Sequence, residues 1–122
     1  MYTIAVDFDG TLVTDAFPDI GKAKPNYIIV LQLFDRVNQI RENEYKDVKL
    51  ILWTCREDLP EGNYLTDAIE YCRNVLKLEF DAINENPWSE WQQKYPNKVR
   101  KIVANEYWDD RAFNPYTGIS IN

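Results

Sequence analysis

The sequence predicts an α/β protein in three layers, with a parallel β-sheet between helices that cover both of its faces. Three observations predict it. Short apolar segments alternate along the chain with longer segments of helical spacing, an order typical of parallel sheets. The segment 48–53, VKLILW, is apolar almost throughout, as expected for a strand covered on both faces. The length of 122 residues fits one domain, 1–122, with a single core.

The first expected strand lies in the stretch 3–12, TIAVDFDGTL. The apolar run 4–6 leads directly to two aspartates, Asp7 and Asp9. Side chains alternate along a strand, so these two carboxylates begin on the same face, with Phe8 turned away from them. Two negative charges this close repel each other unless a cation, a proton or a bound substrate is present. The pair is therefore a candidate functional site.

The other elements follow from apolar periodicity and from turn residues. In 27–43 and 64–76 the apolar residues recur at helical spacing, and Cys72 lies on the buried side of the second helix. Proline and glycine mark the connecting segments. In chain order we expect a flap, a helix, a strand, a loop, a helix, a short strand, a brief helix, a strand and a candidate last strand at 13–26, 27–43, 48–53, 57–63, 64–76, 80–83, 88–94, 102–108 and 119–121.

The composition excludes several classes of chemistry. The chain contains no histidine, which excludes Ser-His-Asp and Cys-His catalysis and every histidine metal site. Its two cysteines, Cys55 and Cys72, are too few for a zinc site, and we expect both to be reduced. Any chemistry must therefore come from carboxylates, lysine, arginine and hydroxyl groups.

The charge and the apolar segments limit partners and location. With 20 acidic and 14 basic residues and a net charge of -6, the chain disfavours nucleic acid and anionic membranes as partners, although a local basic patch stays open. No apolar run approaches the ~18 residues of a membrane span, and the N-terminal segment lacks the basic region of a signal peptide. We therefore expect a cytoplasmic protein with no membrane partner.

Three of the expected strands end in polar side chains, which a parallel sheet brings to one edge. Ligands bind at the carboxyl ends of strands in such sheets, near the point where the strand order reverses. Mg²⁺ prefers the hard oxygens of carboxylates, and a bound cation would remove the repulsion between Asp7 and Asp9. The residues at the three strand ends are Asp7 and Asp9, Thr54 and Arg56, and Asp109 and Asp110.

Three stretches of the chain resemble motifs of the haloacid dehalogenase (HAD) superfamily of phosphatases and phosphotransferases. The first motif, an apolar strand followed by D-x-D-G-T, is similar to DFDGTL, and the second, an apolar strand ending in Thr or Ser, to LILWTCR. The third and fourth are similar to KIVANEYWDDRA. The resemblance extends over 3–112 and implies a Rossmann-like, HAD-like fold. The gaps between the motifs are too short for the cap domain of larger members, so we expect no cap and an open site.

The resemblance implies a role for each motif residue. Asp7 would attack phosphorus and become an aspartyl phosphate, an established use of carboxylates. Asp9 would protonate the leaving oxygen and then activate the water that breaks the intermediate. Thr54 and Lys101 would hold the phosphoryl oxygens, with Lys98 as the alternative lysine.

Arg56 has two interpretations. Thr-x-Arg after the second strand resembles the Ser-x-Arg of polynucleotide kinase 3′-phosphatase domains, which implies that Arg56 helps to bind phosphate. The alternative is a surface arginine paired with Glu57 or Asp58. We also expect the turn at Gly10 and Thr11 to expose backbone N–H groups near the phosphate.

The implied metal ion is Mg²⁺, held between Asp7, the backbone carbonyl of Asp9 and the acidic pair Asp109 and Asp110. Of that pair, Asp110 is the favoured ligand, and Asp109 would orient water or neighbouring groups. Mn²⁺ in place of Mg²⁺ stays open.

Together these observations predict a Mg²⁺-dependent hydrolase, a phosphatase acting on a small phosphorylated metabolite such as a sugar phosphate or a nucleotide. Without a cap, substrate selection falls to the flap 13–26, to the loop 56–63 or to a partner in an oligomer. Two alternatives stay open. One is a polynucleotide 3′-phosphatase, and the other is a non-catalytic module that binds metal or phosphate.

Overall fold

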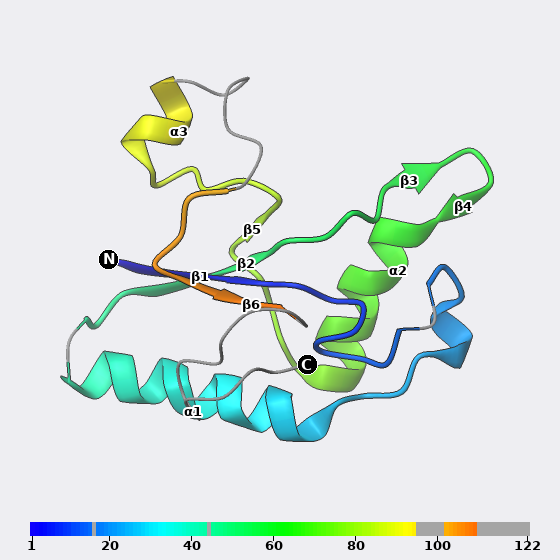
Figure 1. Ribbon diagram of the computed structural model, residues 1–122, viewed down its shortest axis with the longest axis horizontal. Coiled ribbons are helices and arrows are strands. Elements are labelled where there is room, and N and C mark those ends of the chain that lie inside the picture. The colour runs from blue at the N-terminus through cyan, green and yellow to red at the C-terminus, as the bar shows by residue number, and fades with distance from the viewer. Residues whose placement is uncertain (16, 44, 95–101, 110–122) are drawn as a thin grey trace.

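The computed structural model describes residues 1–15, 17–43, 45–94 and 102–109 (Figure 1). The predictions made for Lys98, Lys101, Asp110 and the candidate strand 119–121 lie outside these residues.

A four-stranded parallel sheet forms the centre of the molecule, which confirms the predicted α/β class. Its strand order is β5-β2-β1-β6, so that β1 lies between β2 and β6. Every pairing between neighbours in this sheet is parallel, and Val6 of β1 is in register with both Leu52 and Trp108. The four strands are β1 (Tyr2–Val6), β2 (Val48–Leu52), β5 (Ala82–Ile83) and β6 (Glu106–Trp108).

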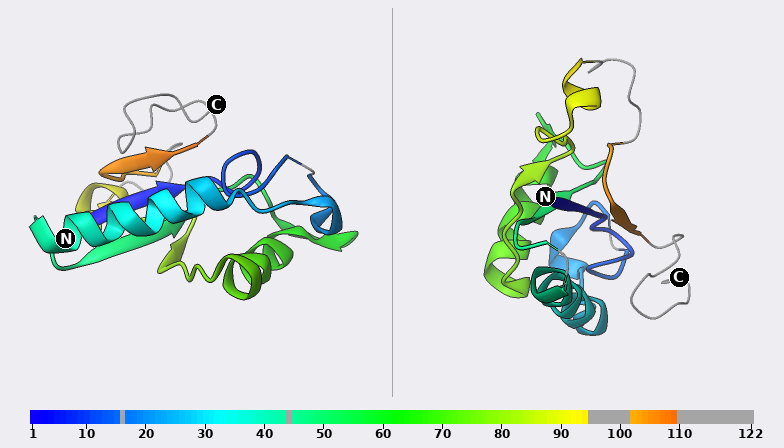
Figure 2. Two further views of the ribbon diagram at one scale, coloured as in Figure 1. Left: turned by 90° about the horizontal axis from the view of Figure 1, so that it is seen from below. Right: turned by 90° about the vertical axis from the view of Figure 1, so that its left-hand side faces the viewer.

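Helices α1 (Tyr27–Asn43) and α2 (Tyr64–Tyr71) lie on the same face of this sheet (Figure 2). α1 begins and ends as predicted, because its apolar residues at helical spacing, among them Leu33 and Ile40, are buried in the core on this face. α2 continues directly into a π-helical turn, η2 (Cys72–Leu76), and Cys72 is buried as predicted. Burial raises the pKa of the Cys72 thiol to about 12.

The opposite face of the sheet carries a smaller cluster around Ala5 and Ile51. Among the described residues, Ile102 and Trp88 pack against it. The predicted brief helix is α3 (Glu90–Lys94), shorter than expected at its start. The layer that covers this face is thus built mainly from irregular segments in the described part of the chain. The prediction that helices cover both faces of the sheet is therefore not confirmed within these residues.

Further segments differ from expectation, and β6 takes up only 106–108 of the strand predicted at 102–108. The loop predicted at 57–63 contains an antiparallel hairpin of β3 (Asp58–Leu59) and β4 (Gly62–Asn63). The carboxylate of Asp58 accepts the backbone N–H of Thr66 at 2.9 Å, which fastens the hairpin to the first turn of α2. The third strand is also shorter than predicted, because the carboxylate of Asp81, rather than a strand carbonyl, accepts the N–H of Leu50 at 2.8 Å.

The segment predicted to be a flap, 13–26, contains a short 3-10 helix, η1 (Ile20–Lys22).

Both cysteines are free thiols, Cys55 exposed and Cys72 buried. In the part of the chain that the structure describes, no helix has the length and apolar character needed to cross a membrane.

Candidate functional site

The carboxyl ends of β1, β2 and β6 meet at one edge of the sheet, as the sequence predicts. The N–H of Asp7 donates to the carbonyl of Trp108 at 2.8 Å, which extends the β1–β6 pairing by one residue. On the other side, the N–H of Trp53 donates to the carbonyl of Val6 at 2.9 Å. The end of β1 therefore lies between Trp53, which precedes Thr54, and Trp108, which ends β6 and precedes Asp109.

The turn after β1 closes on itself through backbone hydrogen bonds. Gly10 has a φ of 82°, a left-handed conformation that glycine adopts without steric cost. The N–H of Gly10 donates to the carbonyl of Val13 at 3.0 Å, and the N–H of Thr11 to the carbonyl of Phe8 at 3.2 Å. The expectation that these two N–H groups face a phosphate is therefore wrong, since the turn itself uses them. The Asp7 carboxylate accepts the N–H of Phe8 at 2.8 Å, which orients it at the strand end.

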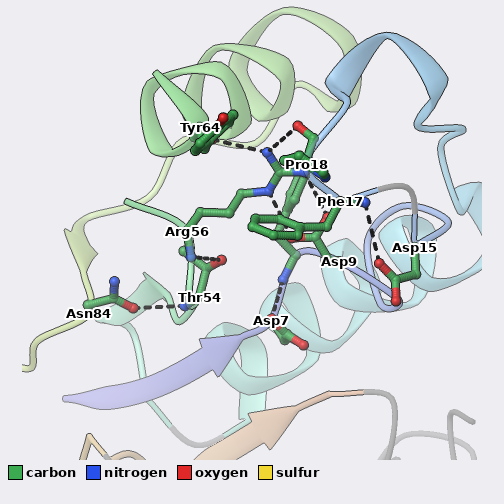
Figure 3. Close-up of polar contacts among 10 residues, drawn as sticks. Asp7, Asp9, Asp15, Phe17, Pro18, Thr54, Arg56, Tyr64 and Asn84 are labelled. Carbon is green, nitrogen blue, oxygen red and sulfur yellow. Dashed lines mark hydrogen bonds and ion pairs between the residues drawn. The ribbon is translucent and has the colours of Figure 1, made fainter. Parts of the chain in front are cut away.

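The side chain of Arg56 turns inward and forms a two-pronged ion pair with Asp9 (Figure 3). Its Nε donates to one carboxylate oxygen at 2.8 Å and its Nη2 donates to the other at 2.9 Å. Arg56 is 1% exposed, whereas Asp9 is 18% exposed. The alternative of a surface arginine paired with Glu57 or Asp58 is therefore wrong.

Arg56 also connects Asp9 to the flap and to α2. Its Nη1 donates to the carbonyl of Pro18 at 3.4 Å and to the carbonyl of Tyr64 at 3.2 Å. With the two bonds to Asp9, these contacts use four of the five N–H donors of a guanidinium. The guanidinium lies 5.1 Å from the ring centre of Phe8 and 5.1 Å from that of Phe17. These contacts position Asp9, and the prediction that Arg56 binds phosphate stays a prediction.

Thr54 is held by a residue to which the sequence assigned no role. The side-chain oxygen of Asn84 accepts the N–H of Thr54 at 2.7 Å, and the Thr54 hydroxyl oxygen accepts the N–H of Arg56 at 3.1 Å (Figure 3). Asn84 directly follows β5 and has a φ of 54°, which asparagine tolerates better than most residues. The position of Asn84 directly after a strand at this edge was the signal in the sequence that could have identified it. Asparagine is also common in ordinary polar turns, so the sequence alone did not assign it to the site.

The oxygen donors at this edge suit a hard cation such as Mg²⁺. Asp7 and Asp109 each follow directly after a strand, one position beyond the Val6–Trp108 pair of the β1–β6 register. The carboxylate of Asp9 is directed at Arg56, which leaves its backbone carbonyl as the predicted ligand. Within the described residues, no group of three or more acidic or cysteine side chains is close enough to hold a metal ion. Two predicted residues lie outside the described part of the chain: Asp110, the favoured metal ligand of the acidic pair, and Lys101, the favoured one of the two candidate phosphate-binding lysines.

Comparison with known proteins finds one informative similarity. The chain is similar to the conserved protein coded by a locus of Bacteroides thetaiotaomicron, with a TM-score of 0.61 and 36% sequence identity, over 96% of this chain and 79% of that one. No protein-family model matches the sequence, and no curated protein matches it at a significant level.

Proposed function

The chain belongs to the same family as the conserved Bacteroides thetaiotaomicron protein, and we propose that it is a phosphatase that cleaves phosphate monoesters through an aspartyl phosphate on Asp7. The observation that carries the proposal is the meeting of three strand ends at one edge of the sheet, with Asp7 directly after β1, Asp109 directly after β6 and Asp9 held by Arg56. The proposal also makes the chain a capless, cytoplasmic member of the HAD superfamily, in keeping with the motifs that its sequence resembles.

The reaction requires two carboxylates with different roles. A carboxylate oxygen of Asp7 attacks phosphorus, and the bond between phosphorus and the ester oxygen breaks. Asp9 gives its proton to that leaving oxygen. In the second half, Asp9 takes a proton from water, whose oxygen attacks the same phosphorus and releases inorganic phosphate with Asp7 restored.

The forked contact with Arg56 holds the Asp9 side chain in place for this role. A carboxylate has about four lone-pair sites, and Arg56 uses two of them, so the remaining sites are available for a proton. The fork of the guanidinium fixes the plane of the carboxylate, which directs its free sites.

The remaining residues bind the phosphoryl group and the cation. Asn84 holds the backbone of Thr54, so that the Thr54 hydroxyl can donate to a phosphoryl oxygen. Bound Mg²⁺ would offset the charge of the transferring phosphoryl group. Its ligands would be Asp7, the backbone carbonyl of Asp9 and one of the acidic pair Asp109 and Asp110.

The decisive experiment combines a panel of phosphate esters with one substitution. We expect hydrolysis that requires Mg²⁺ and stops with EDTA, and we expect Asp7→Asn to lower turnover by roughly 10⁴-fold or more, because the nucleophile is lost. Circular dichroism checks that the fold is retained. The matched control is Asp47→Asn, an exposed aspartate at the amino end of β2, on the far edge of the sheet.

Each other outcome has a defined meaning. Full activity of the Asp7→Asn protein would disprove the phosphoenzyme. No turnover on the whole panel with Mg²⁺ or Mn²⁺ would favour the non-catalytic module. Faster hydrolysis of a 3′-phosphorylated oligonucleotide than of its mononucleotide would favour a polynucleotide 3′-phosphatase. Thr-x-Arg in this chain resembles the Ser-x-Arg motif of such enzymes.

A further inference from the structure

An aromatic ring lies half exposed beside the Asp9–Arg56 pair. Phe17, in the flap, is 53% exposed, although the neighbouring Phe8 is completely buried. One side of the Phe17 ring packs on the guanidinium of Arg56, 5.1 Å from the ring centre, and its ring centre lies 6.1 Å from that of Tyr64 (Figure 3). A large apolar side chain that stays half exposed next to a candidate active site is available for contact with a ligand.

The backbone on both sides of this ring is held in place. The N–H of Phe17 donates to the carboxylate of Asp15 at 3.4 Å, and the carbonyl of Pro18 accepts from Arg56 at 3.4 Å. These bonds hold the backbone, while the ring itself contacts Tyr64 and the guanidinium of Arg56. A ring that is already ordered loses little conformational entropy when a ligand stacks on it.

The distance from the ring to the chemistry is short. The same guanidinium touches the Asp9 carboxylate at 2.8 Å and the Phe17 ring at 5.1 Å. The Phe17 ring therefore lies beside the arginine that holds Asp9, the residue proposed to protonate the leaving group, so that a leaving group bound near Asp9 can reach the ring. A nucleobase in the leaving group can form π-stacking with the ring, whereas a sugar without a base has no π-system and gains less from it.

We propose that Phe17 stacks on the base of a nucleotide substrate, which makes nucleoside monophosphates the preferred substrate class over simple sugar phosphates. This inference rests on the proposed phosphatase function and adds the substrate class to it. The outer face of Phe17 takes the base, while its inner face stays on Arg56. The flap is thus the specificity element of the proposed capless site.

The test compares adenosine 5′-monophosphate with ribose 5-phosphate, which carry the same phosphate and differ in the base. We expect the wild-type kcat/KM to be at least about tenfold higher for the nucleotide, since stacking of one base is commonly worth that much. Phe17→Leu keeps an apolar side chain without the aromatic ring. It should raise KM for the nucleotide roughly tenfold and leave kcat and the values for ribose 5-phosphate nearly unchanged.

Two further variants separate stacking from packing. Phe17→Trp keeps a stacking surface and should restore the preference for the nucleotide. Trp91→Leu removes an aromatic ring of similar exposure, 54%, from α3 and should leave kcat and KM unchanged for both substrates.

The outcomes distinguish this inference from the proposed function. Equal kcat/KM values for the two substrates in the wild type, or equal losses in Phe17→Leu, would overturn the inference and leave the phosphatase standing. Hydrolysis of neither substrate and of no other ester on the panel would overturn both.

Discussion

Two arginine–carboxylate pairs of low exposure among the described residues, Arg56–Asp9 and Arg36–Glu106, differ in which partner is more buried. In the pair at the candidate site, Arg56 is 1% exposed and its partner Asp9 is 18% exposed. In the second pair, between α1 and β6, Arg36 is 18% exposed and its partner Glu106 is 7% exposed. The site pair buries the cation and leaves the acid accessible, whereas the second pair buries the acid beneath the cation.

The surroundings of Glu106 show why that acid is structural. It accepts hydrogen bonds from the Nε of Arg36 at 2.9 Å, from the Nε1 of Trp108 at 3.1 Å and from the hydroxyl of Tyr2. These donors come from α1, β6 and β1, so that the carboxylate joins a helix to two strands. Its hydrogen-bonding capacity is used within the fold, and a substrate has no access to it.

The comparison teaches how the same two residue types serve different purposes. A carboxylate that is covered on every side stabilises the fold, because each of its oxygens satisfies a buried donor. A carboxylate held from one side by a buried arginine is oriented and still able to exchange a proton. The difference lies in which partner is buried, and it can be tested by changing each pair in the same way.

Among changes to the two pairs, the largest effect on kcat is expected from replacing Arg56. Arg56→Lys should lower kcat by roughly 10²-fold, because lysine cannot reproduce the forked contact that orients Asp9. Arg36→Lys, the matched control, should leave kcat within about twofold while it weakens the fold. Steady-state kinetics on a phosphate ester measures both variants.

The same variants separate the two roles proposed for Arg56. If Arg56 binds the substrate phosphate, Arg56→Lys raises KM and weakens inhibition by inorganic phosphate. If it positions Asp9, kcat falls and inhibition by phosphate is retained. An unchanged kcat would contradict the positioning role.

The next effect concerns stability. Glu106→Gln should lower the free energy of unfolding by about 2 kcal/mol, because the amide loses the charge that Arg36, Tyr2 and Trp108 contact. Urea denaturation measures the change, and the activity of the folded protein should stay the same. As a control, Glu79→Gln alters an acid that is 78% exposed and should change stability by less than about 0.5 kcal/mol. A loss of activity in the Glu106→Gln protein at full folding would contradict the structural assignment.

The smallest effect is the dependence of stability on pH. Burial alone would raise the pKa of Glu106, but the hydrogen bonds from Arg36, Tyr2 and Trp108 and the charge of Arg36 lower it below its ordinary value of 4.5. The folded state thus binds this proton less tightly than the unfolded chain. The resulting stabilisation is present above about pH 4.5 and is lost as the pH falls through the folded-state pKa.

Tyr2 gives the opposite dependence at high pH. Burial and the hydrogen bond and negative charge of Glu106 raise its pKa from 10.0 to about 12. The stabilisation from the neutral tyrosine is therefore complete below pH 10 and is lost as the pH rises through about 12. Urea denaturation over a pH series should show both changes in the wild type and a smaller acid change in Glu106→Gln. Parallel curves for the two proteins would contradict the assignment.

Much of the fold could be predicted from the sequence, because its main elements depend on local patterns. The buried face of 27–43 follows from apolar residues that recur every three or four positions, and α1 has these bounds. The strand 48–52 follows from a continuous apolar run. Elements that depend on side-chain contacts were less predictable, as in the hairpin anchored by Asp58 and the strand shortened beside Asp81.

The sequence by itself determined that polar residues follow three strands and that a parallel sheet brings them to one edge. It also determined, through the absence of histidine, that any chemistry must come from carboxylates, lysine, arginine and hydroxyl groups. The tertiary structure alone decided the partners: Arg56 turns toward Asp9 across 47 positions of the chain, and Asn84 toward Thr54 across 30. The physical reason is that strand order follows from periodic local signals, whereas the direction of a long side chain depends on the space and the partners that other segments leave for it.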